Sequence, residues 1–216
     1  MTDPASFIQM VSVVALPIIF AITMHEAAHG YVAKRFGDMT AYRQGRVSLN
    51  PLHHIDPIGT IVIPLVSMAL GGFLFGWAKP VPINFNALRN PKEDMMWVAL
   101  AGPASNLVMA IAWAFFLKLA MMMPGNYFAS PLAVMANMGV KINIILMVLN
   151  LLPVPPLDGG RVLVSLLPTR AAYRLAKIEP YGIIILVVLL FSGLLGAILG
   201  PLMSIAVHLI LSLFGL

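Results

Sequence analysis

Long apolar runs make up most of this chain, and short polar stretches separate them. About 20 apolar residues are enough for a helix to cross a bilayer. Phe7–Ala33 and Met95–Met122 are the clearest such runs, and a further one begins near Lys141. The pattern predicts an all-α polytopic membrane protein with six apolar segments in all, about five of which span the membrane.

The apolar run Ile58–Phe75 is the exception, because it carries a proline and a pair of glycines and is followed by a basic loop. If this run crossed the membrane, that loop would lie outside. If it enters and returns, the basic residues stay on the cytoplasmic side, as the positive-inside rule favours. We therefore predict a re-entrant segment, with a short extended β element at Pro80, Val81, Pro82 and Ile83. Such an edge could pair with an unwound peptide.

The C-terminal third is predicted to hold two more short segments. Gly182–Gly196 and Pro201–Phe214 form a pair joined by a tight turn at Gly200 and Pro201. Met121–Gly139 is predicted to be a short external stretch or an interfacial helix. We treat residues 1–216 as one transmembrane domain, with a core over about 7–167 and a C-terminal helix pair over about 181–215.

Composition agrees with a membrane protein and limits its chemistry. Of the 216 residues, 60% are hydrophobic and only 10% are charged, whereas soluble domains carry about 25% charged residues. The formal charge of +5 lies mainly in short loops, which indicates topology rather than nucleic-acid binding and places the N-terminus outside. Because the chain has no cysteine, a metal site must use His, Asp or Glu.

The sequence HEAAH at residues 25–29 places two histidines and a glutamate inside the first apolar run. On a helix, His25 and His29 leave the same face one turn apart, so both can reach one metal ion, with Glu26 beside them as a candidate base. Asp158 lies in a run broken by three prolines and is a candidate third ligand. The alternatives for Asp158 are a helix N-cap or an ion pair with Arg161.

Four other polar residues have simpler explanations. Asn106 either forms an interhelical hydrogen bond or contacts a substrate. His53 and His54 are more simply solvated or interfacial loop residues than ligands, and His208 is more simply a packed or hydrogen-bonded histidine.

Several stretches together resemble the site-2 protease family of intramembrane zinc metalloproteases. They are HEAAH, GPASN at 102–106 and NLLPVPPLDGG at 150–160, with GRVSLNP and GWAKPVPIN typical of its small prokaryotic members, which lack PDZ and CBS domains. The resemblance implies that His25, His29 and Asp158 bind one Zn²⁺ and that Glu26 is the general base. It also implies that Asn150 assists substrate binding or stabilises the oxyanion.

We therefore expect an intramembrane zinc endopeptidase that cleaves a membrane-protein substrate helix within the lipid bilayer. Its expected location is the inner or plasma membrane of a prokaryote, with the active site nearer the cytoplasmic side. Asn106 and Pro80–Ile83 are candidate substrate-binding residues. The alternative is a membrane metal transporter or sensor that uses the same His/His/Asp site.

Overall fold

The computed structural model describes residues 4–62 and 79–216, and these residues form helices and connecting loops without a strand. The predicted short β element is therefore not confirmed, since residues 79–84 carry no regular secondary structure. The elements, in chain order, are α1 (Pro4–Arg35), α2 (Thr40–Arg43), η1 (Pro51–His54), η2 (Pro57–Val62), η3 (Phe85–Ala87), α4 (Pro91–Met121), α5 (Ala129–Asn150), α6 (Asp158–Leu166), α7 (Thr169–Ala176), η4 (Glu179–Tyr181), α8 (Gly182–Phe191) and α9 (Leu194–Ser212).

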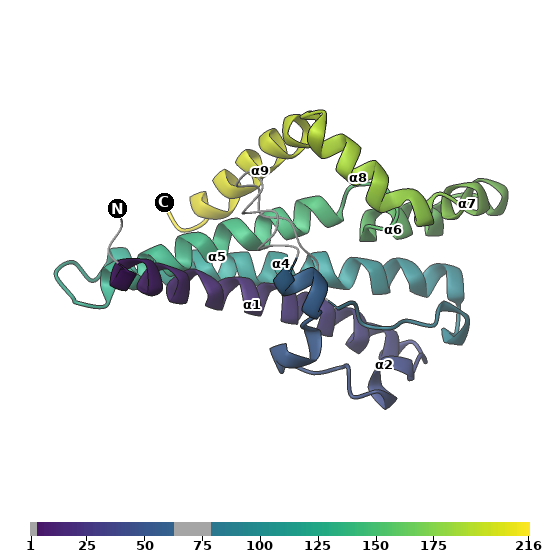
Figure 1. Ribbon diagram of the computed structural model, residues 1–216, viewed down its shortest axis with the longest axis horizontal. Helices are drawn as coiled ribbons and strands as arrows, with labels where there is room; N and C mark the ends of the chain where they lie inside the picture. The colour runs from purple at the N-terminus through teal and green to yellow at the C-terminus, as the bar shows by residue number, and fades with distance from the viewer. Residues whose placement is uncertain (1–3, 63–78) are drawn as a thin grey trace.

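Three long helices, α1, α4 and α5, run side by side and form the centre of the molecule (Figure 1). Small residues allow their backbones to come close, as is common between membrane helices. Ala110 and Ala114 of α4 are fully buried against Val140 and Ile144 of α5. A Cβ at Gly139 of α5 would overlap the ring of Trp113 on α4, so these two helices touch across a glycine.

The helix α5 begins earlier than the sequence pattern indicates. It runs without a break from Ala129 to Asn150, so residues 129–139 are helical and continuous with the segment predicted to begin near Lys141. Lys141 consequently lies within the helix rather than at its start. One charge in a long apolar stretch does not end a helix, because the lysine stem can extend along the helix toward a more polar surrounding.

The C-terminal pair is also arranged differently from the prediction. The turn falls at Ser192 and Gly193, where Gly193 has φ of +76°, and α9 continues through Gly200 and Pro201. The chain thus turns where a left-handed backbone is needed, for which glycine is suited. The helix α8 has 10 residues, or about 15 Å of length, while α9 packs against α5 (Figure 1).

Three described helices, α4, α5 and α9, are long and apolar enough to cross a membrane. The helix α1, with 32 residues, lies alongside α4 and α5. The predicted total of six apolar segments is not confirmed. The re-entrant prediction for Ile58–Phe75 falls mostly on residues 63–78, which lie outside the described residues.

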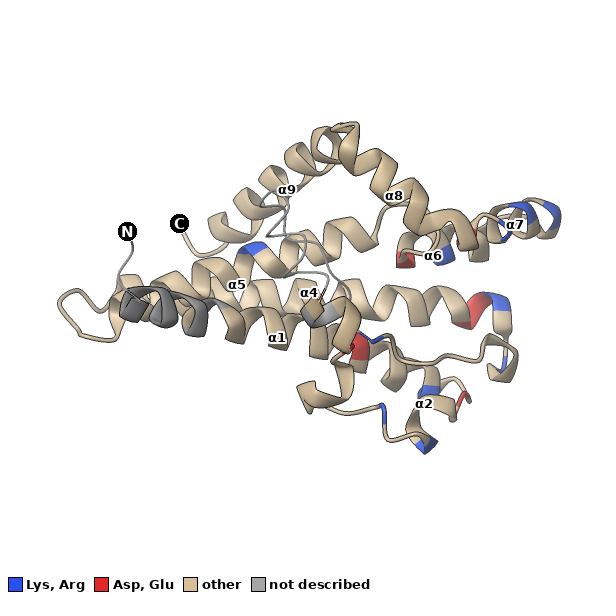
Figure 2. Cartoon of the chain, in the orientation of Figure 1, with Lys and Arg blue, Asp and Glu red and all other residues tan. Residues whose placement is uncertain are grey.

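Charged side chains gather at one end of the helical bundle. Lys and Arg cluster around α2, the start of α4, α6 and α7, while the opposite end holds the α4–α5 loop and both chain termini (Figure 2). The charged end therefore differs in composition from the end that holds the chain termini (Figure 2).

Candidate metal centre

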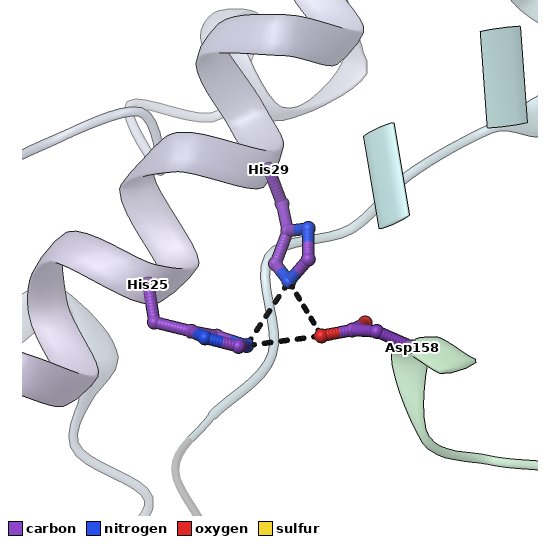
Figure 3. A group of neighbouring side chains, drawn as sticks. All are labelled: His25, His29 and Asp158. Atoms are coloured by element: carbon purple, nitrogen blue, oxygen red, sulfur yellow. Dashed lines mark hydrogen bonds and ion pairs between the residues drawn. The ribbon is translucent and has the colours of Figure 1, made fainter. Parts of the chain in front are cut away.

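His25 and His29 project from one face of α1 toward a common point (Figure 3). Both are buried, with 7% and 6% of their surface exposed. Their rings are nearly perpendicular, with centroids 4.7 Å apart, and the two Nε2 atoms are 3.1 Å apart. The helical spacing of four residues therefore delivers the pair of nitrogens that the sequence predicts.

Asp158 completes the cluster from a distant part of the chain. It is the first residue of α6, after the proline-rich break that ends α5. Its Oδ2 lies 3.2 Å from His25 Nε2 and 3.3 Å from His29 Nε2. The following glycines hold this corner tightly, because a Cβ at Gly160 would lie 2.7 Å from the carbonyl carbon of Val154. The two alternatives for Asp158 are not seen, since Arg161 pairs with Glu179 and Leu157 precedes the helix.

The outer nitrogens of both histidines are held by acceptors. His29 Nδ1 lies 2.7 Å from the carbonyl oxygen of Val98, which can only accept a hydrogen bond. His25 Nδ1 lies 2.6 Å from Asn106 Oδ1. Each Nδ1 therefore donates, and in the neutral imidazole each Nε2 is left with a lone pair that points into the cluster.

Three electron-pair donors thus face one another in a buried site. The carboxylate atom Asp158 Oδ2 has no hydrogen-bond donor among the described residues. This arrangement is unfavourable unless a cation lies between the donors. Ligands about 2.0–2.1 Å from a tetrahedral zinc ion lie roughly 3.3 Å apart, which matches the observed separations of 3.1–3.3 Å. The residues present therefore fit one zinc ion.

Gly102 of α4 forms the back wall of the site. A Cβ there would lie 2.7 Å from His25 Nε2 and still nearer to His29 Nε2. The missing side chain leaves the space in which the three ligand atoms meet. Gly102 was part of the GPASN stretch in the sequence, but its contact with the histidines could not be predicted from that stretch alone.

Glu26 lies one residue beyond His25, half-buried at the edge of the cluster. Its Oε2 accepts a hydrogen bond of 2.8 Å from the backbone N–H of Val81. The segment after the undescribed residues is thereby fixed beside the candidate base. Arg46 holds the same segment by donating to the carbonyl oxygens of Lys79 and Pro80, at 3.0 and 3.3 Å.

The predicted substrate-binding residues differ in their surroundings. Val81 is buried, with its side chain close to Gly30 of α1, and Ile83 packs near Ala33 and Val98. Pro80 is exposed and Pro82 is half-buried. Because prolines have no N–H and Val81 donates to Glu26, this segment offers few free donors to a second chain.

Asn106 and Asn150 make contacts within the bundle. Asn106 is fully buried and bonds to His25 on α1 and Asn143 on α5, so the predicted interhelical hydrogen bond is present. Its surroundings offer no open face for a substrate. Asn150 donates to the carbonyl oxygen of Leu146 on its own helix, at 3.0 Å, and its predicted role at the oxyanion stays a prediction.

The remaining histidines stand apart from the cluster. His53 is exposed, as predicted. His54 is 2% exposed, and its Nε2 lies 2.9 Å from the carbonyl oxygen of Ser48, so the prediction of a solvated residue is wrong for His54. His208 lies exposed on α9 beside a pocket shared with Lys141, rather than packed in the core.

The helical bundle and its buried His/His/Asp cluster indicate the class of protein. It is a helical membrane protein with a metal centre of the metallohydrolase type. Residues 118–193 match peptidase family M50, a stretch that includes Asp158 but begins after the two histidines. The relatives named below cover almost the whole chain. No solved structure matches it.

A Bacillus subtilis protein named "Putative zinc metalloprotease YwhC" is 38% identical over 203 residues, covering 92% of this chain and 89% of its own length. A Mycolicibacterium smegmatis protein named "Putative zinc metalloprotease Rip2" is 33% identical over 191 residues, covering 88% of this chain and 70% of its own. The chain belongs to peptidase family M50. The predicted zinc metalloprotease class agrees with this family, and nothing here supports a transporter or sensor.

Proposed function

We propose that this chain is a zinc-dependent endopeptidase that cleaves substrate proteins in or near their membrane-spanning segments. The observation that carries the proposal is the meeting of two histidine nitrogens and one carboxylate oxygen at a single buried point, with separations of 3.1–3.3 Å. His25, His29 and Asp158 would hold the ion. Three protein ligands leave a fourth position open, as catalytic zinc sites require.

Zinc bound there would supply Lewis acidity, which polarises a peptide carbonyl and makes a water molecule a better nucleophile near neutral pH. Glu26 is the candidate base: its carboxylate accepts a proton from the attacking water and passes it to the leaving amine. The Val81 hydrogen bond occupies Oε2, and a carboxylate oxygen has room for further hydrogen bonds. Asn150 is the candidate donor to the developing oxyanion.

The helical substrate must unwind before its peptide bonds can react, because its carbonyls are engaged in hydrogen bonds. The segment Pro80–Ile83 lies beside Glu26 and is the candidate contact for the unwound strand. Since two of its residues are prolines and the Val81 N–H is bonded to Glu26, we expect it to contribute mainly carbonyl oxygens and apolar side chains. This role and the natural substrate are both part of the proposal.

Substitution of Glu26 tests the proposal directly. Glu26→Gln should retain zinc, measured on the purified protein, and lower cleavage by about 10²- to 10⁴-fold, the usual share of a general base. Cleavage is followed as fragments that disappear from the membrane proteome of cells expressing the variant. Glu93→Gln is the matched control, because Glu93 is exposed in the first turn of α4. A Glu26→Gln variant that cleaves at the wild-type rate would refute the assignment of the base.

The proposed orientation has the N-terminus outside and the metal centre nearer the cytoplasm, in the inner or plasma membrane of a prokaryote. The gathering of basic residues at one end supports it, since cytoplasmic loops are rich in Lys and Arg.

Because the chain has no cysteine, single cysteines can be labelled cleanly. A cysteine at Asn126, in the α4–α5 loop, should react from outside, and one at Asn86, in η3, only after permeabilisation. The reverse pattern would invert the orientation.

A further inference from the structure

A line of buried hydrogen bonds crosses the three central helices and ends on His25. His25 Nδ1 meets Asn106 Oδ1 at 2.6 Å, and Asn106 Nδ2 meets Asn143 Oδ1 at 2.9 Å. Asn143 Nδ2 then donates to the carbonyl oxygen of Gly139 at 2.8 Å. Asn106 and Asn143 are both fully buried, at 0% exposure. The line therefore links α1, α4 and α5 without contact with solvent.

The direction of these hydrogen bonds is fixed by backbone carbonyls. The Gly139 oxygen can only accept, so the amide of Asn143 must turn its Nδ2 toward it and its Oδ1 toward Asn106. Asn106 must then present Nδ2 to Asn143, and that nitrogen also lies 3.3 Å from the carbonyl oxygen of Ala21. Oδ1 of Asn106 is consequently left to face His25 Nδ1.

This order of donors decides which nitrogen of His25 carries the proton. An acceptor at Nδ1 requires a proton on Nδ1, which leaves the lone pair on Nε2, the atom that faces Asp158. If the Asn106 amide were flipped, its Nδ2 would face Nδ1 and the proton would move to Nε2. A proton on Nε2 would point into the metal site and block coordination.

We propose that Asn143 is a positioning residue for metal binding: with the Ala21 carbonyl oxygen, it holds the Asn106 amide in the orientation that keeps Nε2 of His25 free to bind the ion, and it makes the shorter of the two hydrogen bonds to Asn106 Nδ2. Asn143 reaches the ligand cluster through Asn106, which lies between it and His25. The inference rests on the proposed role of His25 as a ligand. A purely structural role is the competing explanation, since buried amides also join membrane helices.

Zinc affinity separates these explanations. Purified protein is stripped of metal in detergent and titrated with Zn²⁺ against a chromophoric chelator, while its thermal unfolding midpoint is recorded. Asn143→Leu removes the amide at similar volume and should weaken zinc binding about tenfold, the lower end for partners outside the ligand set. Asn143→Ala serves as the second variant should leucine prevent folding. Ile144→Ala is the matched control, because this neighbour on α5 is also fully buried and outside the hydrogen-bonded line.

The rescue variant is the sharpest test. An aspartate at position 106 has two accepting oxygens, so it can face His25 Nδ1 without being oriented by Asn143. Asn106→Asp combined with Asn143→Leu should therefore bind zinc more tightly than Asn143→Leu alone. Asn106→Leu should weaken zinc binding at least as much as Asn143→Leu. The double variant Asn106→Leu/Asn143→Leu should bind zinc only slightly more weakly than Asn106→Leu alone.

The outcomes are distinct. Equal zinc affinity in wild type, Asn143→Leu and Asn143→Ala overturns the inference, as does an equal loss in Ile144→Ala or the absence of rescue by aspartate. Wild-type protein that binds no zinc overturns the proposed function itself. A loss of affinity in Asn143→Leu that is rescued by aspartate, with Ile144→Ala affecting only the unfolding midpoint, supports a positioning role.

Discussion

The metal centre and the α8–α9 hairpin are built in opposite ways. At the centre, polar groups lie inside, and Asn106 and Asn143, which have no exposed surface, are hydrogen-bonded to each other. On the hairpin, large apolar side chains face outward: Phe191 is 86% exposed and Ile184 is 61% exposed. A bilayer accepts the second arrangement, because lipid is as apolar as the side chains it touches. The first arrangement is expensive unless every polar group has a partner.

This contrast indicates where the chain tolerates change. In the centre, the available space is fixed by close contacts between helices, so one added methyl group should alter the site. On the hairpin, the outward-facing side chains are largely exposed, and similar changes should matter little. Glycines allow a direct comparison, since they occur in both regions.

The largest effect is expected for Gly102→Ala. The new Cβ would lie 2.7 Å from His25 Nε2, so the histidines must move from the positions in which they meet Asp158. We expect zinc affinity to fall at least about 100-fold, or roughly 3 kcal/mol, in the competition titration. Gly196→Ala on α9 is the matched control, because no atom of the described residues outside its own helix turn lies within 4 Å of its Cβ position. Wild-type affinity in Gly102→Ala would show that the site has more room than the structure indicates.

Gly139→Ala should disturb folding rather than metal binding alone. Its Cβ would lie 2.7 Å from Cδ1 of Trp113 and closer still to Cγ and Cδ2 of the same ring. This overlap would push α4 and α5 apart. Overpacking of this kind costs about 1–3 kcal/mol, measured by denaturant unfolding in detergent micelles. A smaller side chain at position 113 should relieve the overlap. The double variant Gly139→Ala/Trp113→Leu is therefore expected to lose less stability than the two single variants lose together. Strict additivity would argue against this contact.

The same contrast explains what the sequence could predict. His25, Glu26, His29 and Asp158 are recognisable because their chemistry is unusual in an apolar chain and because helical spacing is regular. The helix ends were harder to predict, since α5 continues through Lys141 and α9 through Gly200 and Pro201. In such apolar stretches a helix is favoured almost everywhere, so single charges, glycines and prolines are weak signals of its ends.

The sequence predicted an interhelical hydrogen bond for Asn106, but it did not identify which groups hold the ligands. The Val98 carbonyl that holds His29 is a backbone group, which any residue at that position would offer. Asn143 has no motif around it, although an asparagine in an apolar helix signals that a partner is needed. Such partners depend on how helices from distant parts of the chain are packed, and only the structure provides that.

Gly193→Ala tests the corrected position of the hairpin turn. Gly193 has φ of +76° with nothing near its Cβ position, so the cost is backbone strain alone, about 1–2 kcal/mol for a left-handed non-glycine residue. Gly200→Ala lies inside α9 and also has open space, so it should leave stability unchanged or raise it by up to about 1 kcal/mol. The opposite order of stabilities would place the turn at Gly200 and Pro201, as the sequence pattern first indicated.

The smallest effect is expected on the outer face of the hairpin, for Phe191→Leu. With 86% of its surface exposed, this side chain gives up almost no contact within the protein, so the free energy of unfolding should change by less than about 0.5 kcal/mol. Ile144→Val, at a position that is 0% exposed, removes a single methyl group from the core and should cost about 0.5–1.5 kcal/mol. Both are measured by unfolding in the same micelles. If Phe191→Leu proved the more costly change, the outer face of α8 would have to be covered by something other than lipid or detergent, and the contrast between the two regions would fail there.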